Sequence, residues 1–505
     1  MRKRDLENPQ LPAFEPILKQ LSILVFERGI EALQKADLLR NPRDLTSVIE
    51  SDASAKRRFI RGCHYGWDLA QRRIADLVID YEEQIGKHKE QLKQHLRDRN
   101  KDGINNEKEL IGTIETRQVV LRRLADTILY HLFNMQNWIP RRMMLEYRIH
   151  DIDPSTLQKT IEVATDLNRE ERLDFHLAAD LTTTIHVGDL VKVSFASKPA
   201  KWSLIELKEG KMNALLGDII EKTGGALSEA NLSKIRDQLG NKAVSQAQRM
   251  IRQQYRHREV MRAVETDEGI DIMHNIPVKL KPDEVEIEEY RETIGNLCEK
   301  ARTEGLATAV VDGCFRLVAV NGATYEKLGR MGIAHLLYHF QFGIKDCALS
   351  KQNKSELKDL SKIYPFFDLV QMNLYAMWPP PVFFWLPQDF VQDLLFGRLT
   401  VFAQLDYIKL FARARSEGFE MRWIGRKELG KFPDVSGRIP GSPDAVGIGV
   451  KLIADPSMPE QFVLIGYLSR MFLEFMSPSQ FLTLLRKDFD FAAAHRSKGK
   501  KEEPI

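Results

Sequence analysis

The chain has 505 residues, which is too long for one ordinary domain, so two to four domains are expected. Apolar residues make up 43% and charged residues 29%, which is usual for a soluble globular protein with a sizeable core. The formal net charge is only +3, which excludes nucleic-acid binding through overall charge. Any such surface must come from local clusters of basic residues.

The remaining global features favour the cytoplasm. The cysteines are scattered without a CxxC pair, so neither a zinc ribbon nor a disulfide framework is predicted. The N-terminal sequence MRKRDLENPQ lacks the apolar core of a signal peptide. The most apolar region, residues 366–386, contains Asp368 and three consecutive prolines, which indicates a buried core segment and not a membrane span. We therefore expect no membrane association.

Residues 1–145 are predicted to form a helical domain. Apolar residues at helical spacing indicate a helix over 57–99 and a second over 107–137, with a polar turn at 102–106 between them. Two long helices joined in this way predict an antiparallel helical hairpin. Its polar tip fits a solvated helix end, with an interaction spur for a protein partner as the alternative.

Residues 146–278 are predicted to form a mixed domain of helices and strands. A helix begins near Ser155, with Asp153 or Ser155 as its cap. Two strand-like runs follow, VGDLVKVSF and WSLIELK, joined by a short polar loop. A helix over 231–264 and one strand over 269–280 complete the region. The fold class expected is therefore α+β with several domains.

An acidic residue and an acid-x-lysine triplet stand at the ends of the two strand-like runs. Asp189 begins the first run, and Glu206 and Lys208 end the second. Residues two apart on a strand share a face, so Glu206 and Lys208 project together, and strand pairing could bring Asp189 beside them. Two carboxylates suit Mg²⁺ or Mn²⁺, and a neighbouring lysine can activate a water or stabilise a phosphate. This combination suits metal-assisted cleavage of a phosphodiester.

Across about residues 150–275 the chain resembles the PD-(D/E)xK nuclease superfamily. The resemblance implies a restriction-endonuclease-like core, a small mixed sheet flanked by helices, with Asp189, Glu206 and Lys208 as catalytic residues. Gly188 stands where the motif often has Pro. Many members take a further metal-site carboxylate from the preceding helix. Here Glu162 is the first choice for that third carboxylate, beside Asp189 and Glu206. A plain surface hairpin is the alternative interpretation.

A basic, glutamine-rich helix follows the second strand over residues 242–262, and it looks similar to a helix of some superfamily members. The recombination-type Q-x-x-x-Y spacing is absent, because Ile251 stands four residues before Tyr255. Such a helix suits contact with phosphates, although a solvated basic face is an equal alternative. The candidate nucleic-acid-binding residues are Lys211, Lys242, Gln248, Arg249, Arg252 and Arg256. For Lys211, which lies just beyond the triplet, a turn residue is the simpler interpretation.

Residues 279–494 are predicted to form a C-terminal α/β domain of unknown role, followed by a disordered tail, 495–505. A hairpin is expected around Asp312 and Gly313, and a helix over 387–415. His335 and His339 have a spacing that a metal site could use, but core or surface histidines are the simpler interpretation. No phosphate-binding GxxxxGK[ST] loop and no GxSxG elbow occurs.

The combined sequence features favour a Mg²⁺- or Mn²⁺-dependent nuclease that acts on DNA more readily than RNA. By analogy alone, it could serve bacterial defence against foreign nucleic acid, and two copies could act as a homodimer. The alternatives are a non-catalytic nucleic-acid-binding scaffold with a nuclease-like fold, and a regulatory protein built on the helical hairpin. Retention of all three triplet residues favours the enzyme.

Overall fold

The chain divides into two compact units, residues 6–284 and residues 285–505, and each contains helices and small sheets, so the protein is α+β. The computed structural model describes residues 6–134, 136, 139–140, 143–144, 149, 151–170, 173–196, 200–207, 216, 229–266, 268–271, 276–279, 290–339, 366–376, 381–425, 427–428, 445–458 and 460–499.

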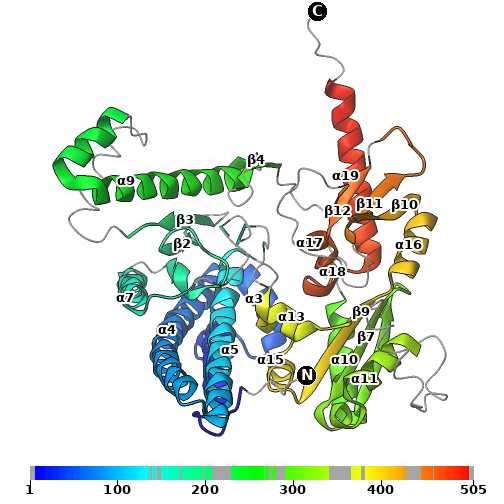
Figure 1. Ribbon diagram of the computed structural model, residues 1–505, viewed down its shortest axis with the longest axis horizontal. Coiled ribbons are helices and arrows are strands. Elements are labelled where there is room, and N and C mark those ends of the chain that lie inside the picture. The colour runs from blue at the N-terminus through cyan, green and yellow to red at the C-terminus, as the bar shows by residue number, and fades with distance from the viewer. Residues whose placement is uncertain are drawn as a thin grey trace, which may run out of the picture. The chain divides into compact units, whose positions relative to one another are not determined.

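The first unit begins with helices, continues through a small sheet and ends in a long helix and a hairpin (Figure 1). Its helices are α1 (Glu15–Phe26), α2 (Arg28–Gln34), η1 (Pro42–Asp44), α3 (Leu45–Ser51), α4 (Ala53–Arg97), α5 (Lys101–Leu132), α7 (Pro154–Glu170), η2 (Ala179–Leu181) and α9 (Glu229–Thr266). Its strands are β1 (Asp174–Ala178), β2 (Leu190–Ser194), β3 (Lys201–Ile205), β4 (Glu268–Asp271) and β5 (Ile276–Lys279).

Helices α4 and α5 form the predicted antiparallel hairpin and lie side by side (Figure 1). The turn, predicted at 102–106, instead lies at residues 98–100. The Asn100 side chain accepts a hydrogen bond from the Gly103 N–H at 3.0 Å and caps α5 from there. Gly103 itself is helical, and the His95 ring lies only 2.6 Å from the point that a Cβ on this residue would occupy. The glycine therefore marks a close contact between the helices and not the turn.

Helix α7 begins as predicted, with Asp153 as its cap. The Asp153 carboxylate accepts hydrogen bonds from the Ser155 N–H at 2.9 Å and the Thr156 N–H at 3.2 Å. The prediction of one strand over 269–280 is wrong, because the structure has two short strands there, β4 and β5, which pair antiparallel with each other. The chain reverses direction between them, so a single strand cannot form.

Strands β1, β2 and β3 form an antiparallel sheet in that order. Side chains that alternate along the strands gather on one face and are buried, as expected for a sheet packed on helices. The buried set comprises Phe175, Leu177, Val191, Val193 and Leu204. The opposite face carries the Lys192–Asp174 ion pair at 2.7 Å and is partly exposed.

The boundary predicted between residues 145 and 146 does not separate compact units, because helix α4 packs directly on strand β1. The His64 ring lies 5.3 Å from the Phe175 ring, and the Trp67 ring lies 5.6 Å from it. The buried Gln71 side chain donates to the His176 carbonyl at 3.1 Å. The helical hairpin and the sheet thus share one core, whereas the boundary predicted at 278–279 lies close to the division at 284–285.

A pair of glycine substitutions on α4 is expected to change stability in opposite directions. A Cβ at Gly66 would overlap the Leu24 carbonyl and the Arg28 side chain, so Gly66→Ala forces apart α1, α2 and α4 and should lower the free energy of unfolding by about 1–3 kcal/mol. Gly86 has open space around it, so Gly86→Ala should raise that free energy by about 0.5–1 kcal/mol through helix propensity. Urea unfolding followed by circular dichroism measures both. Equal effects would contradict the close helix contact.

Acid is expected to destabilise this unit through two buried histidines. Burial lowers the pKa of His64 to about 4, opposed by Asp174, and burial lowers the pKa of His131 to about 4. The unfolded chain, with an ordinary pKa near 6.5, binds these protons first, so stability falls as pH drops from about 6.5 toward 4. His131→Phe, which keeps a ring beside Trp67, should flatten that slope in urea titrations at several pH values. An unchanged slope would contradict the assignment.

The second unit contains an antiparallel four-stranded sheet in the order β6-β7-β9-β8 and a three-stranded one in the order β10-β11-β12. Its strands are β6 (Leu306–Val311), β7 (Phe315–Asn321), β8 (Phe366–Asp368), β9 (Leu399–Leu405), β10 (Phe419–Gly425), β11 (Ala445–Leu452) and β12 (Gln461–Leu464). Its helices are α10 (Arg291–Glu304), α11 (Gly322–His339), α13 (Leu369–Tyr375), α14 (Val382–Trp385), α15 (Gln388–Leu395), α16 (Tyr407–Ser416), α17 (Ile465–Leu468), α18 (Arg470–Leu473) and α19 (Pro478–Gly499).

The second unit corrects three predictions. Its described strands pair antiparallel, so it is α+β and not α/β. The helix predicted over 387–415 is interrupted by strand β9, because Gly397 with φ of 75° follows the end of α15 and all seven residues of β9 are buried in the sheet. The tail predicted to be disordered from residue 495 is helical as far as Gly499. The Asp312–Gly313 hairpin is confirmed, with φ of 51° and 73° at these two residues.

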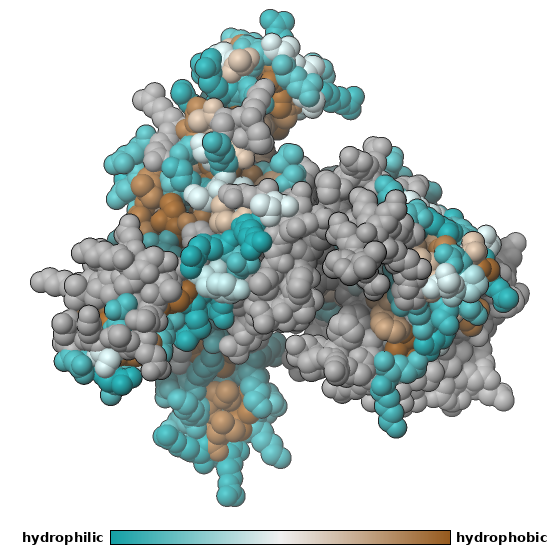
Figure 2. All heavy atoms as spheres, turned by 90° about the horizontal axis from the view of Figure 1, so that it is seen from above, coloured by the Kyte–Doolittle hydropathy of each residue, from teal (hydrophilic) through white to brown (hydrophobic). Residues whose placement is uncertain are grey.

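No helix in the described ranges is long and apolar enough to cross a membrane. On the face shown in Figure 2, hydrophilic residues make up most of the coloured surface, and the hydrophobic patches between them are smaller.

Candidate functional site

The pairing of β2 with β3 determines where Asp189 lies. The ladder ends at the pair Leu190 and Ile205, so Asp189 and Glu206 each lie one residue beyond it, at the same end of the hairpin. The Asp189 N–H donates to the Ile205 carbonyl at 2.8 Å, so Asp189 and Leu190 both face Ile205, as in a β-bulge. The hairpin therefore brings the two acids of the motif to the same end of the sheet.

The Asp189 carboxylate makes a hydrogen bond to the second strand. It accepts from the Leu207 N–H at 2.5 Å, and Leu207 is the residue between Glu206 and Lys208. Asp189 and Glu206 are both half-buried at the open end of the hairpin. The hydrogen bond fixes Asp189 relative to the acid-x-lysine segment, although Lys208 itself lies outside the described residues.

Gly188 explains why the residue before the acid is not proline in this chain. Its φ is 80°, in the left-handed region, whereas the proline ring fixes φ near −65°. A Cβ at this position would also lie 3.2 Å from the Leu204 Cβ. The turn that delivers Asp189 to its strand thus requires glycine.

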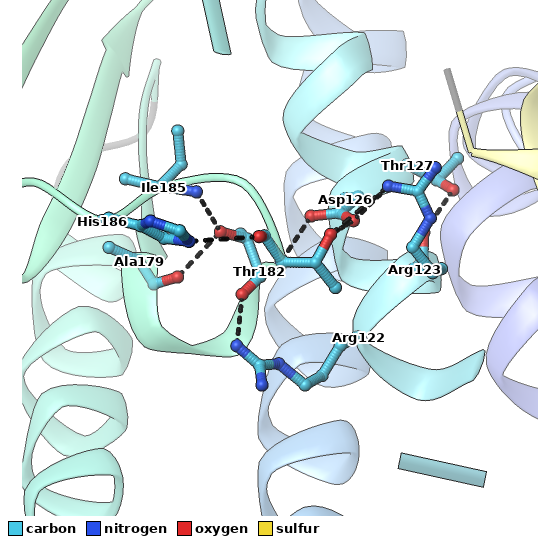
Figure 3. Close-up of polar contacts among 9 residues, drawn as sticks. Arg122, Arg123, Asp126, Thr127, Ala179, Thr182, Ile185 and His186 are labelled. Atoms are coloured by element: carbon cyan, nitrogen blue, oxygen red, sulfur yellow. Dashed lines mark hydrogen bonds and ion pairs between the residues drawn. The ribbon is translucent and has the colours of Figure 1, made fainter. Parts of the chain in front are cut away.

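Helix α5 anchors the segment between β1 and Asp189 through buried polar groups (Figure 3). The Arg122 guanidinium donates to the Thr182 carbonyl at 2.6 Å and to the Asp180 carbonyl at 3.3 Å. Burial lowers the pKa of Arg122 to about 10, and neighbouring carboxylates, Asp126 first, oppose that shift. The segment that ends at Asp189 is therefore attached at its start to a long helix.

A second anchor lies one residue further along the same segment (Figure 3). The Asp126 carboxylate accepts from the Thr183 N–H at 2.8 Å and from the Thr183 hydroxyl at 2.5 Å. Arg123 forms an ion pair with Asp126 at 2.8 Å, and both side chains are fully buried. Sequence reasoning missed this network. The signal for it was a run of charged residues, RRLAD, within an otherwise apolar helix.

His186 has a structural role in the turn before Asp189. Its backbone N–H donates to the Met143 carbonyl at 3.0 Å, and its Nε2 lies 3.3 Å from the Thr183 carbonyl. These contacts hold the turn before Asp189 in place.

Glu162 lies on the exposed face of α7. The face that α7 buries carries Leu157, Ile161 and Ala164, which pack toward the sheet and α4. The Glu162 carboxylate accepts from the Gln158 side chain at 2.9 Å. This placement gives no support to the prediction that Glu162 completes the metal site, because the helix turns that side chain outward.

Helix α9 presents the predicted basic residues opposite an apolar stripe. Gly240, with φ of 83°, divides it, and the second segment buries Ala243, Ala247 and Met250. The other side carries the candidate phosphate contacts: Lys242, Gln248 and Arg252 are exposed and Arg256 is half-buried. Arg249 belongs to the same helix, but its side chain and all of Lys211 lie outside the described residues.

The two described acids at the hairpin, Asp189 and Glu206, carry the oxygen ligands that a hard divalent cation prefers. Within the described residues, no group of three or more His, Cys, Asp or Glu side chains is arranged to hold a metal. Mg²⁺, however, is commonly held by one or two carboxylates, with water and substrate phosphate completing its shell. Asp189 and Glu206 are the two described residues that could supply such carboxylates. His335 is buried, and the His339 side chain lies outside the described part.

Comparisons of this chain with models of known protein families, with curated proteins and with solved structures found no match.

Proposed function

We propose that the protein is a metal-dependent nuclease that hydrolyses phosphodiester bonds, with DNA as the preferred substrate and RNA as the alternative. The observation that carries the proposal is the hydrogen bond from the Leu207 N–H to the Asp189 carboxylate, which joins Asp189 to the residue between Glu206 and Lys208 at one end of the hairpin. Half-burial of both acids leaves them accessible to a substrate while part of their hydration is removed.

The chemistry is divided among three residues. Asp189 and Glu206 would hold Mg²⁺ or Mn²⁺, which supplies Lewis-acid activation of the phosphate when bound. Lys208, two residues after Glu206 in the sequence, is assigned to orient the attacking water or to stabilise charge on the phosphate. Lys242, Gln248, Arg249, Arg252 and Arg256 are assigned to contacts with the phosphate backbone.

The order of elements supports a restriction-endonuclease-like core as part of this proposal. A helix, three strands, a helix and a further strand follow one another from α7 to β4. In the described residues β4 pairs with β5 and not with the three-stranded sheet. The mixed sheet expected of the superfamily therefore rests on the resemblance alone.

A non-catalytic scaffold is the second candidate, and one observation favours it. The Asp189 carboxylate accepts a backbone hydrogen bond at a strand end, which is a purely structural use of an acid. Under this alternative α9 would bind nucleic acid without cleavage. A role in defence and assembly into a homodimer are further proposals that rest on analogy.

The test is incubation of the purified full chain with plasmid DNA, single-stranded DNA and RNA, with Mg²⁺, Mn²⁺ or EDTA. Cleavage that requires the metal supports the nuclease and identifies its substrate. Binding without cleavage under every condition, by folded protein, would favour the scaffold.

A further inference from the structure

Three arginines line an open pocket on α4, in the same unit as the Asp189–Glu206 pair. Arg57, Arg58 and Arg61 surround a hollow of about 400 Å³ and are all exposed. Their spacing of one, three and four residues places them on one side of the helix. The pocket is not part of the site described above.

The floor of this pocket is made of small residues because α2 and α4 cross closely. A Cβ at Gly62 would lie 2.7 Å from the Ala32 Cβ and 2.7 Å from the Arg28 carbonyl. Gly62 and Ala32 both line the pocket. The hollow is thus built by the helix crossing, and the arginines stand along its rim.

The positive charge of the rim lacks compensation. Two other arginines of the same helices are paired, Arg28 with Glu31 at 2.7 Å and Arg72 with Asp68 at 3.0 Å. No described carboxylate forms an ion pair with any of the three pocket arginines. Three such cations around one hollow form a site to which an external anion can bind.

An aromatic ring and a hydroxyl complete the rim. Tyr65 lies one turn beyond Arg61 and is 62% exposed, and Ser54 lies one turn before Arg57. Arginines contact phosphates, and an exposed ring gives an unpaired base a surface for stacking. Duplex DNA keeps its bases stacked within the helix, and a membrane surface would need exposed apolar side chains. Among anionic partners, a single strand uses every group on this rim.

We propose that the Arg57–Arg58–Arg61 pocket with Tyr65 binds single-stranded nucleic acid, its phosphates on the arginines and one base on the tyrosine. The pocket lies remote from the candidate cleavage site. His64, the neighbour of Tyr65, has its ring 5.3 Å from the Phe195 ring. Phe195 follows the end of β2 that is away from Asp189, and the six residues between them span about 20 Å of extended chain. Binding here does not require cleavage, so the inference goes beyond the proposed nuclease activity.

The test measures fluorescence anisotropy of a labelled oligothymidylate and of a duplex of equal length with the full chain in EDTA. The Arg57→Gln, Arg58→Gln, Arg61→Gln triple variant should weaken single-strand binding about 10-fold or more and reduce the magnitude of the log–log salt slope by about 2. Tyr65→Ala should weaken it about 5-fold or more, whereas Tyr65→Phe retains the ring and should bind as wild type does. The comparison of Tyr65→Ala with Tyr65→Phe tests the proposal even if the triple variant misfolds.

A matched control removes the same charge from the other end of α4. Lys87, Lys89 and Arg97 lie there, and their combined change to Gln should leave binding unaltered. An equal loss in this control, identical binding by Tyr65→Ala and wild type, or tighter binding to duplex would each overturn the proposal. So would binding to anionic vesicles or phosphopeptides without binding to the oligonucleotide. Because EDTA prevents metal-dependent cleavage, an inactive Asp189–Glu206 pair would not alter these results.

Discussion

Glu206→Gln and Lys208→Ala are each expected to lower metal-dependent cleavage by about 100- to 10,000-fold, the range for removal of a group that acts in the transition state. Glu206→Gln keeps the size of the side chain but removes the negative charge that would attract the metal. Lys208→Ala removes the group assigned to the attacking water. Initial rates on the preferred substrate with saturating Mg²⁺ measure both.

Lys201→Ala is the matched control for Lys208→Ala. Lys201 is an exposed lysine at the start of β3, paired with Ser194, so its loss changes the charge equally but at the end of the strand away from Asp189. We expect its cleavage rate to equal that of wild type. Glu162→Gln tests the third carboxylate, and its exposed position on α7 predicts little change. Cleavage that survives both Glu206→Gln and Lys208→Ala in folded protein would end the nuclease assignment at this hairpin.

The β2–β3 hairpin, with Asp189 and Glu206 at one end, was predictable because its sequence signals are local. Side chains two apart share a face whatever the rest of the fold does, and one short loop between two apolar runs favours a hairpin. The same reasoning located the α4–α5 hairpin from its apolar stripe and the Asp312–Gly313 turn from its two residues. None of these required knowledge of distant contacts.

Features that depend on distant contacts were not predictable. The apolar run of β9 reads as part of a helix until the neighbouring strands β7 and β8 are placed beside it. The pairing of β4 with β5 depends on a reversal within an apparently continuous strand. The burial of Arg122 and Arg123 depends on carbonyl and hydroxyl partners 60 residues later in the chain, whereas arginines in a helix normally indicate a solvated face.

The largest loss of stability is expected at the network that those arginines form. Asp126→Ala should lower the free energy of unfolding of the first unit by about 3–5 kcal/mol, the usual effect of removing one partner of a buried ion pair. The substitution leaves the Arg123 guanidinium, which is fully buried, without its carboxylate partner. It also removes the acceptor of the Thr183 N–H. Urea unfolding measures the change from the shift of the midpoint, with the m-value, the slope of the unfolding free energy against urea concentration, the same in both proteins.

Glu90→Ala provides the contrast, because Glu90 and Lys93 have the same three-residue spacing at 2.6 Å on the exposed end of α4. Water solvates that lysine fully once its partner is gone, so the unfolding midpoint should not move. Asp126 also holds the segment that leads to Asp189, so Asp126→Ala should reduce cleavage at temperatures where the variant remains folded. Asp126→Ala with the stability of wild type would show that the buried pair is not formed, and unchanged cleavage by a destabilised variant would show that Asp189 is positioned by its own strand alone.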